Sequence, residues 1–225
     1  MERSFDIFFS GLALLVLSPL LVPIVVILKC SGEGEVFFLQ ERIGKNGKFF
    51  KLLKFATMLK DSPNLGTGTV TMKGDPRVLP VGKFLRKSKI NELPQLLNIF
   101  FGDMSVIGPR PLTAQTFGSY SDSTQTIIKQ VRPGLSGVGS IIFRGEEDIM
   151  HGATASVAFY HDVIAPYKGA LEEWFVSNKS IYVYFMAIFT TVWAVLFPKS
   201  KVAWVVFKGL PRPPEELKMA LNYRE

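Results

Sequence analysis

The stretch RKSKINELPQLLNIFFGDMSVIGPRP, residues 86–111, decides the fold and carries much of the chemistry. It joins a basic start, two polar residues, an amphipathic segment and a stiff Gly-Pro-Arg-Pro end. Four apolar residues follow helical i, i+3, i+4, i+7 spacing, and three polar residues form the opposite stripe: Leu93, Leu96, Leu97 and Phe100 against Asn91, Gln95 and Asn98. The pattern predicts a short amphipathic helix that begins near Asn91.

Asn91 is predicted to cap this helix, because Asn is among the best N-cap residues. Pro94 would then lie in the first turn, where its missing N–H costs nothing, and Gly102 would end the helix. A helix N-terminus also offers free N–H groups and a partial positive charge, which favour a phosphate. Capping and ligand binding therefore both remain open for Asn91.

Two rigid turns follow, and each carries an arginine. Pro109 and Pro111 fix φ on both sides of Arg110, so its guanidinium starts from a stiff backbone. An Arg-Pro-Gly turn at residues 132–134 has the same character. Because guanidinium groups suit bidentate contacts with phosphate, the pattern favours anion binding at Arg110 over a solvated arginine in a loop.

Composition narrows the class of partner. The 225 residues suffice for one medium-sized domain plus an anchor. A net charge of +7 predicts anionic partners, and a mean hydropathy of +0.24 favours a membrane surface over DNA. There is no recognition-helix pattern or basic stripe, so no nucleic-acid partner is expected. The lone Cys30 allows no intrachain disulfide, and the spacing of His151 and His161 argues against a zinc or haem site.

The N-terminal segment from Phe5 to Leu28 is almost wholly apolar and long enough to enter a bilayer. Its length and the lack of an Ala-x-Ala-like site predict an anchor rather than a cleaved signal. Ser18-Pro19 and Pro23 interrupt the run, and a proline kinks a helix. The residues alone leave two alternatives open, namely a helix that spans the bilayer and one that enters and leaves on the same face.

Two further segments complete the expected body. Asn46-Gly47 predicts a type I′ hairpin between strands at 36–40 and 49–55, with Lys54 as the site candidate on the returning strand. Residues 61–76 are typical of a loop. The uncharged run from Ile181 to Phe197 predicts a helix that is buried, lies in the headgroup plane or just crosses the bilayer.

These segments together resemble the bacterial sugar transferases, also called monotopic phosphoglycosyl transferases, from Phe5 to Phe197. The resemblance rests on an ordered series of motifs: Ser18-Pro19, Arg42-Ile43-Gly44, Lys54-Phe55-Ala56-Thr57-Met58, Asp75-Pro76-Arg77, Gly82-Lys83-Phe84-Leu85-Arg86, Asn91-Glu92-Leu93-Pro94-Gln95-Leu96, Gly102-Asp103-Met104-Ser105, Gly108-Pro109-Arg110-Pro111, Arg132-Pro133-Gly134 and Pro166-Tyr167-Lys168.

The resemblance implies an α+β monotopic membrane protein with a re-entrant anchor helix broken at Ser18-Pro19. It also implies a small β-hairpin and a mainly helical body with amphipathic interfacial helices, on the cytoplasmic face of the bacterial inner membrane. The expected division is an anchor at 1–30, a transferase domain at 31–198 and a C-terminal tail at 199–225.

The implied reaction moves a sugar-1-phosphate from a UDP-linked sugar to undecaprenyl (polyprenol) phosphate, the first membrane step of a surface glycan pathway. The family uses Mg²⁺ and an Asp-Glu pair, and its Asp attacks the phosphate nearest the sugar and releases UMP. The expected partners are the nucleotide-sugar, the lipid phosphate and the bilayer, and a homo-oligomer stays open. The site residues implied are Asn91 and Glu92 for catalysis, Lys54, Arg86, Pro109, Arg110, Pro111 and Arg132 for phosphate, and Glu92 and Asp103 for Mg²⁺.

The chain departs from the family pattern at the nucleophile, where Asn91 replaces Asp, and at Ala56, where a basic residue is usual. A neutral amide is a poor nucleophile toward phosphate. Three accounts follow: Glu92 attacks instead, the lipid phosphate attacks directly in a ternary complex, or the chain is a catalytically impaired paralogue that binds nucleotide-sugar or lipid phosphate.

Overall fold

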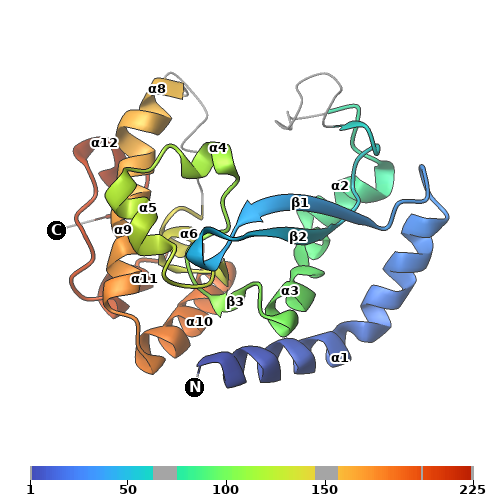
Figure 1. Ribbon diagram of the computed structural model, residues 1–225, viewed down its shortest axis with the longest axis horizontal. Coiled ribbons are helices and arrows are strands. Elements are labelled where there is room, and N and C mark those ends of the chain that lie inside the picture. The colour runs from blue at the N-terminus through green and yellow to red at the C-terminus, as the bar shows by residue number, and fades with distance from the viewer. Residues whose placement is uncertain (1, 63–74, 145–156, 199, 224–225) are drawn as a thin grey trace. The chain divides into compact units, whose positions relative to one another are not determined.

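The computed structural model describes residues 2–62, 75–144, 157–198 and 200–223. The described residues form a mixed structure of helices and two small sheets, as the sequence predicts (Figure 1). The first half contains α1 (Glu2–Lys29), β1 (Phe37–Ile43), η1 (Lys45–Gly47), β2 (Phe49–Phe55), α2 (Pro80–Lys87), η3 (Ile90–Glu92) and α3 (Gln95–Phe101). The second half contains β3 (Ser105–Ile107), α4 (Ala114–Phe117), α5 (Asp122–Ile128), β4 (Gly134–Ser136), α6 (Val138–Ile142), α8 (Val157–Phe159), η4 (Tyr160–Ile164), α9 (Ala165–Ser177), α10 (Ile181–Leu196), α11 (Val202–Val206) and α12 (Glu215–Lys218).

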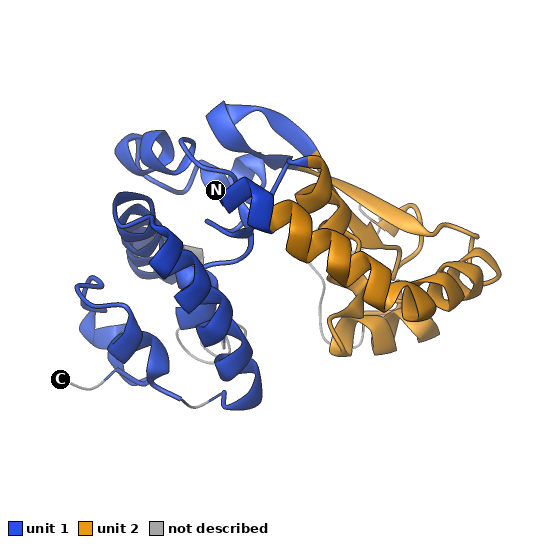
Figure 2. Ribbon diagram, turned by 90° about the horizontal axis from the view of Figure 1, so that it is seen from below, with its two compact units in different colours: residues 1–5, 42–50, 102–225 blue, residues 6–41, 51–101 orange. Residues whose placement is uncertain are grey.

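The chain divides into two compact units that interleave along the sequence (Figure 2). Unit 1 holds residues 1–5, 42–50 and 102–225, and unit 2 holds residues 6–41 and 51–101. Both α1 and the β1–β2 hairpin are therefore divided between the units. The first residues of α1 and the turn end of the hairpin belong to unit 1, and the rest of each belongs to unit 2. Each unit is described below by itself.

The helix α1 is continuous from Glu2 to Lys29 and is long and apolar enough to cross a membrane. Pro19 and Pro23 lie inside it, and Figure 1 shows the helix changing direction along its length. Pro19 has no N–H for the carbonyl of Leu15, and the hydroxyl of Ser18 donates to that oxygen at 2.8 Å instead. The Ser18-Pro19 pair thus bends the helix while satisfying the backbone, which apolar surroundings require.

The predicted hairpin is confirmed. Strands β1 and β2 pair in a two-stranded sheet, and the Gly44 N–H donates to the Lys48 carbonyl at 2.8 Å. Asn46 and Gly47 have φ of 58° and 73°, the left-handed values that both central residues of a type I′ turn need. The first strand runs to Ile43, three residues further than predicted.

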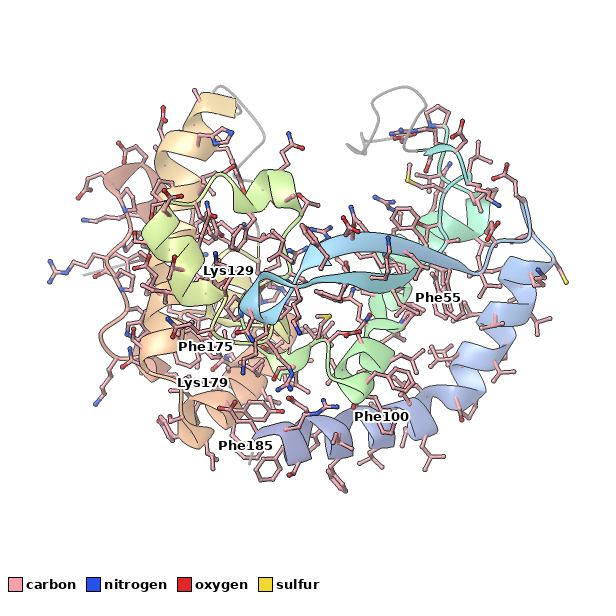
Figure 3. The ribbon with its side chains drawn as sticks, viewed as in Figure 1. Phe55, Phe100, Lys129, Phe175, Lys179 and Phe185 are labelled. Atoms are coloured by element: carbon pink, nitrogen blue, oxygen red, sulfur yellow. The ribbon has the colours of Figure 1, made fainter. Side chains whose placement is uncertain are left out.

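In unit 2, β2 and α1 enclose a small core of Ile24, Leu28, Phe55 and Leu85, with Phe55 labelled in Figure 3. The segment after β2 touches the start of α2, because a Cβ on Gly82 would lie only 2.2 Å from the Thr57 carbonyl oxygen. This close approach requires glycine and places α2 directly against Thr57. Within the predicted loop at 61–76, residues 63–74 lie outside the described residues, while Asp75 and Arg77 form a buried ion pair at 2.6 Å.

The predicted amphipathic helix exists as α3, but it begins at Gln95 rather than at Asn91. Gly102 follows its end with φ of 101°, as predicted. Its buried residues include the polar Gln95 and Asn98 as well as the apolar Leu96 and Ile99. Phe100 from the apolar stripe lies against Gly11 of α1, whose added Cβ would be 3.3 Å from the ring (Figure 3).

Unit 1 is organised around a parallel pair of short strands, with Ser105 opposite Gly134 in β3 and β4. Their ends meet through glycines, since a Cβ on Gly134 would stand 2.1 Å from the Gly108 nitrogen. The neighbouring core contains Leu112, Phe117, Tyr120, Ile128 and Ala165. Helix α9 contributes further buried residues such as Phe175, which Figure 3 labels.

The C-terminal apolar run forms α10, within one residue of the predicted bounds. In unit 1 the first residues of α1 contact this region: Glu2 pairs with Lys179 at 2.7 Å, and the rings of Phe5 and Phe185 stand edge to face at 5.1 Å (Figure 3). The polar tail that follows packs onto unit 1, where Leu217 of α12 is fully buried.

Candidate active site

The predicted cation Lys54 and the predicted acid Glu92 meet in unit 2. The Nζ atom of Lys54, at the end of β2, lies 3.3 Å from Oε1 of Glu92, at the end of η3. Their side chains are 21% and 30% exposed, so the pair is sheltered but reachable. Lys51 and Glu41 on the same hairpin form a second pair, at 3.6 Å, but their side chains are 63% and 58% exposed, as expected for a solvated strand face.

The strand that carries Lys54 is held from behind by Asn98. The Leu53 N–H donates to Asn98 Oδ1 at 2.9 Å, and Asn98 Nδ2 donates to the Lys51 carbonyl at 2.8 Å. Asn98 is 1% exposed, so these two bonds satisfy both ends of a buried amide. The side chain of Asn98 on α3 thereby fixes the position of the β2 backbone next to Lys54.

Arg86 extends from α2 toward the same segment of unit 2. Its guanidinium makes a long hydrogen bond of 3.5 Å to the hydroxyl of Thr57, and Thr57 follows β2 three residues after Lys54. Gly82, one helical turn before Arg86, packs closely on the Thr57 carbonyl. This contact positions α2 so that Arg86 reaches Thr57. Unit 2 therefore contains two contacts between predicted site segments, Lys54 with Glu92 and Arg86 with Thr57.

Asn91 does not cap a helix, so that prediction was wrong. Lys89, with a left-handed φ of 59°, turns the chain into the single turn η3, and Asn91 lies inside it. The Oδ1 atom of Asn91 is buried and has no hydrogen-bond partner. A buried amide oxygen without a donor costs free energy, which makes it a candidate ligand atom beside Glu92.

The other predicted phosphate-binding group lies in unit 1, at the Pro109-Arg110-Pro111 turn. Both prolines are buried and Arg110 is exposed. The carbonyl of Pro109 accepts from the Gly134 N–H at 2.8 Å, and that of Pro111 accepts from Arg42 at 3.1 Å. The turn is thus fixed on both sides while the guanidinium remains available to an anion.

Arg132 and Asp103 also belong to unit 1. The Nε of Arg132 donates to the Gly102 carbonyl at 2.8 Å, which gives this arginine a structural contact. Asp103 is exposed. Their predicted roles, in phosphate binding and in metal binding, stay predictions.

A buried acid contacts the main chain of the Pro-Arg-Pro turn. Glu172 of α9 is 3% exposed, and the Arg110 main-chain N–H donates to its carboxylate. Burial raises the pKa of Glu172 to about 7, against the lowering effect of the charges of Lys168 and Arg110. Sequence inspection missed this residue, although an acid four residues after Lys168 and flanked by Leu171 and Phe175 was a usable signal.

Among the described residues no group of three or more His, Cys, Asp or Glu side chains could hold a metal ion. Asn91 and Glu92 are nonetheless consecutive residues of η3, and Asn91 Oδ1 lacks a hydrogen-bond partner. Mg²⁺ usually takes one or two protein oxygens and completes its shell with substrate phosphates and water. This donor set fits such an ion.

Comparison with known proteins identifies the class to which this fold and site belong. Residues 1–198 match the family described as bacterial sugar transferase. The exopolysaccharide production protein ExoY of Rhizobium meliloti (strain 1021) is 36% identical over 208 residues, which cover 86% of this chain and 84% of that protein. The chain therefore belongs to the bacterial sugar transferase family. It is an enzyme of the phosphoglycosyl transferase class.

Two longer relatives bear the name of a reaction. The UDP-glucose:undecaprenyl-phosphate glucose-1-phosphate transferase of Escherichia coli (strain K12) is 37% identical over 162 residues, covering 71% of this chain and 35% of that protein. The UDP-N-acetylgalactosamine-undecaprenyl-phosphate N-acetylgalactosaminephosphotransferase of Aeromonas hydrophila is 32% identical over 203 residues, covering 87% of this chain and 43% of that protein. The present chain thus spans less than half of each of these two.

Proposed function

We propose that the chain transfers a sugar-1-phosphate from a UDP-sugar to undecaprenyl phosphate at a bacterial membrane, as the first membrane step of a surface polysaccharide. The observation that carries the proposal is the sheltered Lys54–Glu92 pair at 3.3 Å, formed by two residues at the positions the family uses. The names of the Escherichia coli and Aeromonas hydrophila relatives support the donor and the acceptor. Which sugar is transferred stays open.

The proposed roles follow from charge. Phosphoryl transfer depends on positioning and on neutralising charge, and the protein supplies little covalent chemistry. Lys54 and Arg86 offer cations to the diphosphate in unit 2, and Arg110 offers a guanidinium on a rigid turn in unit 1. Arg132 is proposed as a secondary phosphate contact.

Mg²⁺ is the proposed cofactor, and the Glu92 carboxylate together with Asn91 Oδ1 would hold it in unit 2. When bound, the ion neutralises charge on the diphosphate. Lys54 keeps the Glu92 carboxylate in place before substrate arrives, through the contact of 3.3 Å between Nζ and Oε1.

The proposed route is direct transfer. An oxygen of the lipid phosphate attacks the phosphorus nearest the sugar, the bond from that phosphorus to the bridging oxygen breaks, and the electron pair leaves with UMP. Asn91 is a poor alternative nucleophile because its oxygen is neutral and buried, and the Glu92 carboxylate is engaged by Lys54. The acceptor phosphate carries its own negative oxygen and needs no enzyme-bound intermediate.

The proposed location is the cytoplasmic face of the inner membrane, with α1 as a re-entrant anchor. The two prolines inside α1, and the Ser18 hydroxyl that replaces the missing donor, support a helix that bends within lipid. The exposed aromatic residues of α10, among them Phe189 and Trp193, suit the interfacial region.

The test is UMP release by the purified chain in detergent or nanodiscs with Mg²⁺ and a panel of UDP-sugars. We expect UMP only when undecaprenyl phosphate is also present, together with a lipid-linked sugar diphosphate in equal amount. If no UDP-sugar in the panel gives UMP, the proposed function is wrong, and binding of the donor without turnover would then identify the impaired paralogue.

A further inference from the structure

Glu172 is a buried acid that the proposed reaction does not use. Its side chain leaves α9 inside unit 1, is 3% exposed, and its Oε2 has no hydrogen-bond partner. A carboxylate in such surroundings is costly unless a specific contact compensates for it. The question is which contact keeps it there.

The contact is the main chain of Arg110, whose N–H donates to the Glu172 carboxylate. Pro109 and Pro111 have no N–H, so Arg110 carries the only main-chain donor in the Pro-Arg-Pro turn. That single donor goes to Glu172. The turn is thereby held at three points, because the carbonyls of Pro109 and Pro111 are bound by Gly134 and Arg42.

Two groups confine the carboxylate from other sides. Gly139 of α6 leaves room for it, since a Cβ at that position would lie 2.4 Å from Glu172 Oε1 and 3.1 Å from its Cδ. Lys168, one turn earlier on α9 and 6% exposed, places a positive charge beside it, with Nζ 5.4 Å from the Phe143 ring centre. The carboxylate is therefore held in one position by α6, α9 and the turn.

We propose that Glu172 is a positioning residue for Arg110: its buried carboxylate anchors the Arg110 N–H and so sets where the guanidinium meets a phosphate oxygen. The inference rests on the proposed function, which assigns anion binding to Arg110. The phosphate oxygen belongs either to the nucleotide diphosphate or to the lipid phosphate. Both sources present the same chemistry to a guanidinium.

The experiment measures dissociation constants of the purified full-length chain for UDP with Mg²⁺ and, separately, for a short-chain polyprenyl phosphate. Four variants are compared with the parent, Glu172→Ala, Glu172→Gln, Arg110→Ala and the double variant Arg110→Ala/Glu172→Ala. Glu173→Gln serves as the matched control, because the next residue of α9 contacts Thr124 instead.

We expect Glu172→Ala to weaken binding of at least one ligand about tenfold, and Glu172→Gln to restore most of it because the amide oxygen still accepts the Arg110 N–H. The double variant should bind no more weakly than Arg110→Ala alone, since Glu172 acts through Arg110. A merely structural acid would add its effect to that of Arg110→Ala. The ligand that responds identifies the phosphate that Arg110 holds.

Unchanged binding of both ligands in Glu172→Ala, or independent effects in the double variant, would overturn the inference. Gly139→Ala keeps folding from obscuring the result, because it displaces the carboxylate while retaining it, and it should reproduce part of the loss. Absence of UDP and lipid-phosphate binding by the parent would also overturn it. If binding follows the expected pattern but no UMP is released, the proposed function fails and the positioning role stands.

Discussion

The amide of Asn98 and the main-chain N–H of Leu53 are joined at 2.9 Å, and this bond fixes β2 at the residue before Lys54. The same amide donates a second hydrogen bond to the Lys51 carbonyl, at 2.8 Å, so that Asn98 holds the β2 backbone at two points. Lys54, a predicted phosphate-binding residue, therefore lies on a strand that is held by a buried amide of α3. Stability and activity are linked at this point.

Replacing Asn98 with Ala should lower both the stability of the chain and its rate of UMP release. The substitution removes the partner of the Leu53 N–H and of the Lys51 carbonyl, two partly buried hydrogen bonds, which costs about 2 kcal/mol and lowers the melting temperature by several degrees. UMP release should fall because Lys54 loses its fixed backbone. Thermal unfolding and turnover measure the two effects, and Asn178→Ala, which removes an exposed helix-end amide, is the control. Unchanged activity would show that the two hydrogen bonds of Asn98 do not position Lys54.

Restoring an acid at residue 91 should change the route of the reaction. Asn91→Asp places a carboxylate beside Glu92, where the family has its nucleophile. With UDP-sugar alone, this variant should form a phosphosugar adduct detectable by intact-protein mass spectrometry, whereas the parent and Asn91→Ala should form none. An adduct on Glu92 of the parent would contradict direct transfer.

The bend in α1 predicts the topology of the N-terminus. In a Cys30→Ser background, Ser4→Cys should react with an impermeant thiol reagent only from the cytoplasmic face if α1 is re-entrant. Adding Pro19→Ala supplies an N–H for the Leu15 carbonyl and straightens the helix, so residue 4 should move to the opposite face. Leu20→Ala is the control. Labelling of the parent from the periplasmic face would contradict the re-entrant proposal.

The acid Glu172 should make stability depend on pH. Its pKa is raised from the usual 4.5 to about 7, so between these values the folded chain binds more protons than the unfolded chain, and stability falls as pH rises through that window. Glu172→Gln lacks this titration. Its melting temperature relative to the parent should therefore increase from pH 5 to pH 8, while Glu173→Gln should show no such trend. A constant difference would mean that Glu172 stays ionised across the range.

Local signals in the sequence predicted the local elements well. Asn46-Gly47 requires left-handed φ at both residues, and the structure has it. Gly102 ends α3 for the same reason, and the uncharged run after Ser180 gives α10 almost residue for residue. These features depend on backbone conformation or on a long apolar stretch, both of which are properties of neighbouring residues.

The buried face of α3 could not be predicted in this way. Periodicity separates a polar stripe from an apolar one, and for a soluble domain the apolar stripe is the buried one. Here Phe100 meets the apolar α1 while Asn98 turns inward to a strand distant in sequence. The prediction that Asn91 caps the helix failed because η3 begins after Lys89, which has a left-handed φ. Such a backbone conformation is usually signalled by a glycine, and this position has none. Glu172 depends on contacts with Arg110 and Gly139 that no local pattern contains.

The central claim is that the Lys54–Glu92 pair forms the catalytic centre, and UMP release by Glu92→Gln tests it most directly. Glu41→Gln, which breaks the exposed pair with Lys51 on the same hairpin, is the matched control. We predict that Glu92→Gln lowers the rate of UMP release by about a hundredfold or more at saturating UDP-sugar and undecaprenyl phosphate, while Glu41→Gln stays within about twofold of the parent. A Glu92→Gln rate equal to that of the parent would contradict the account.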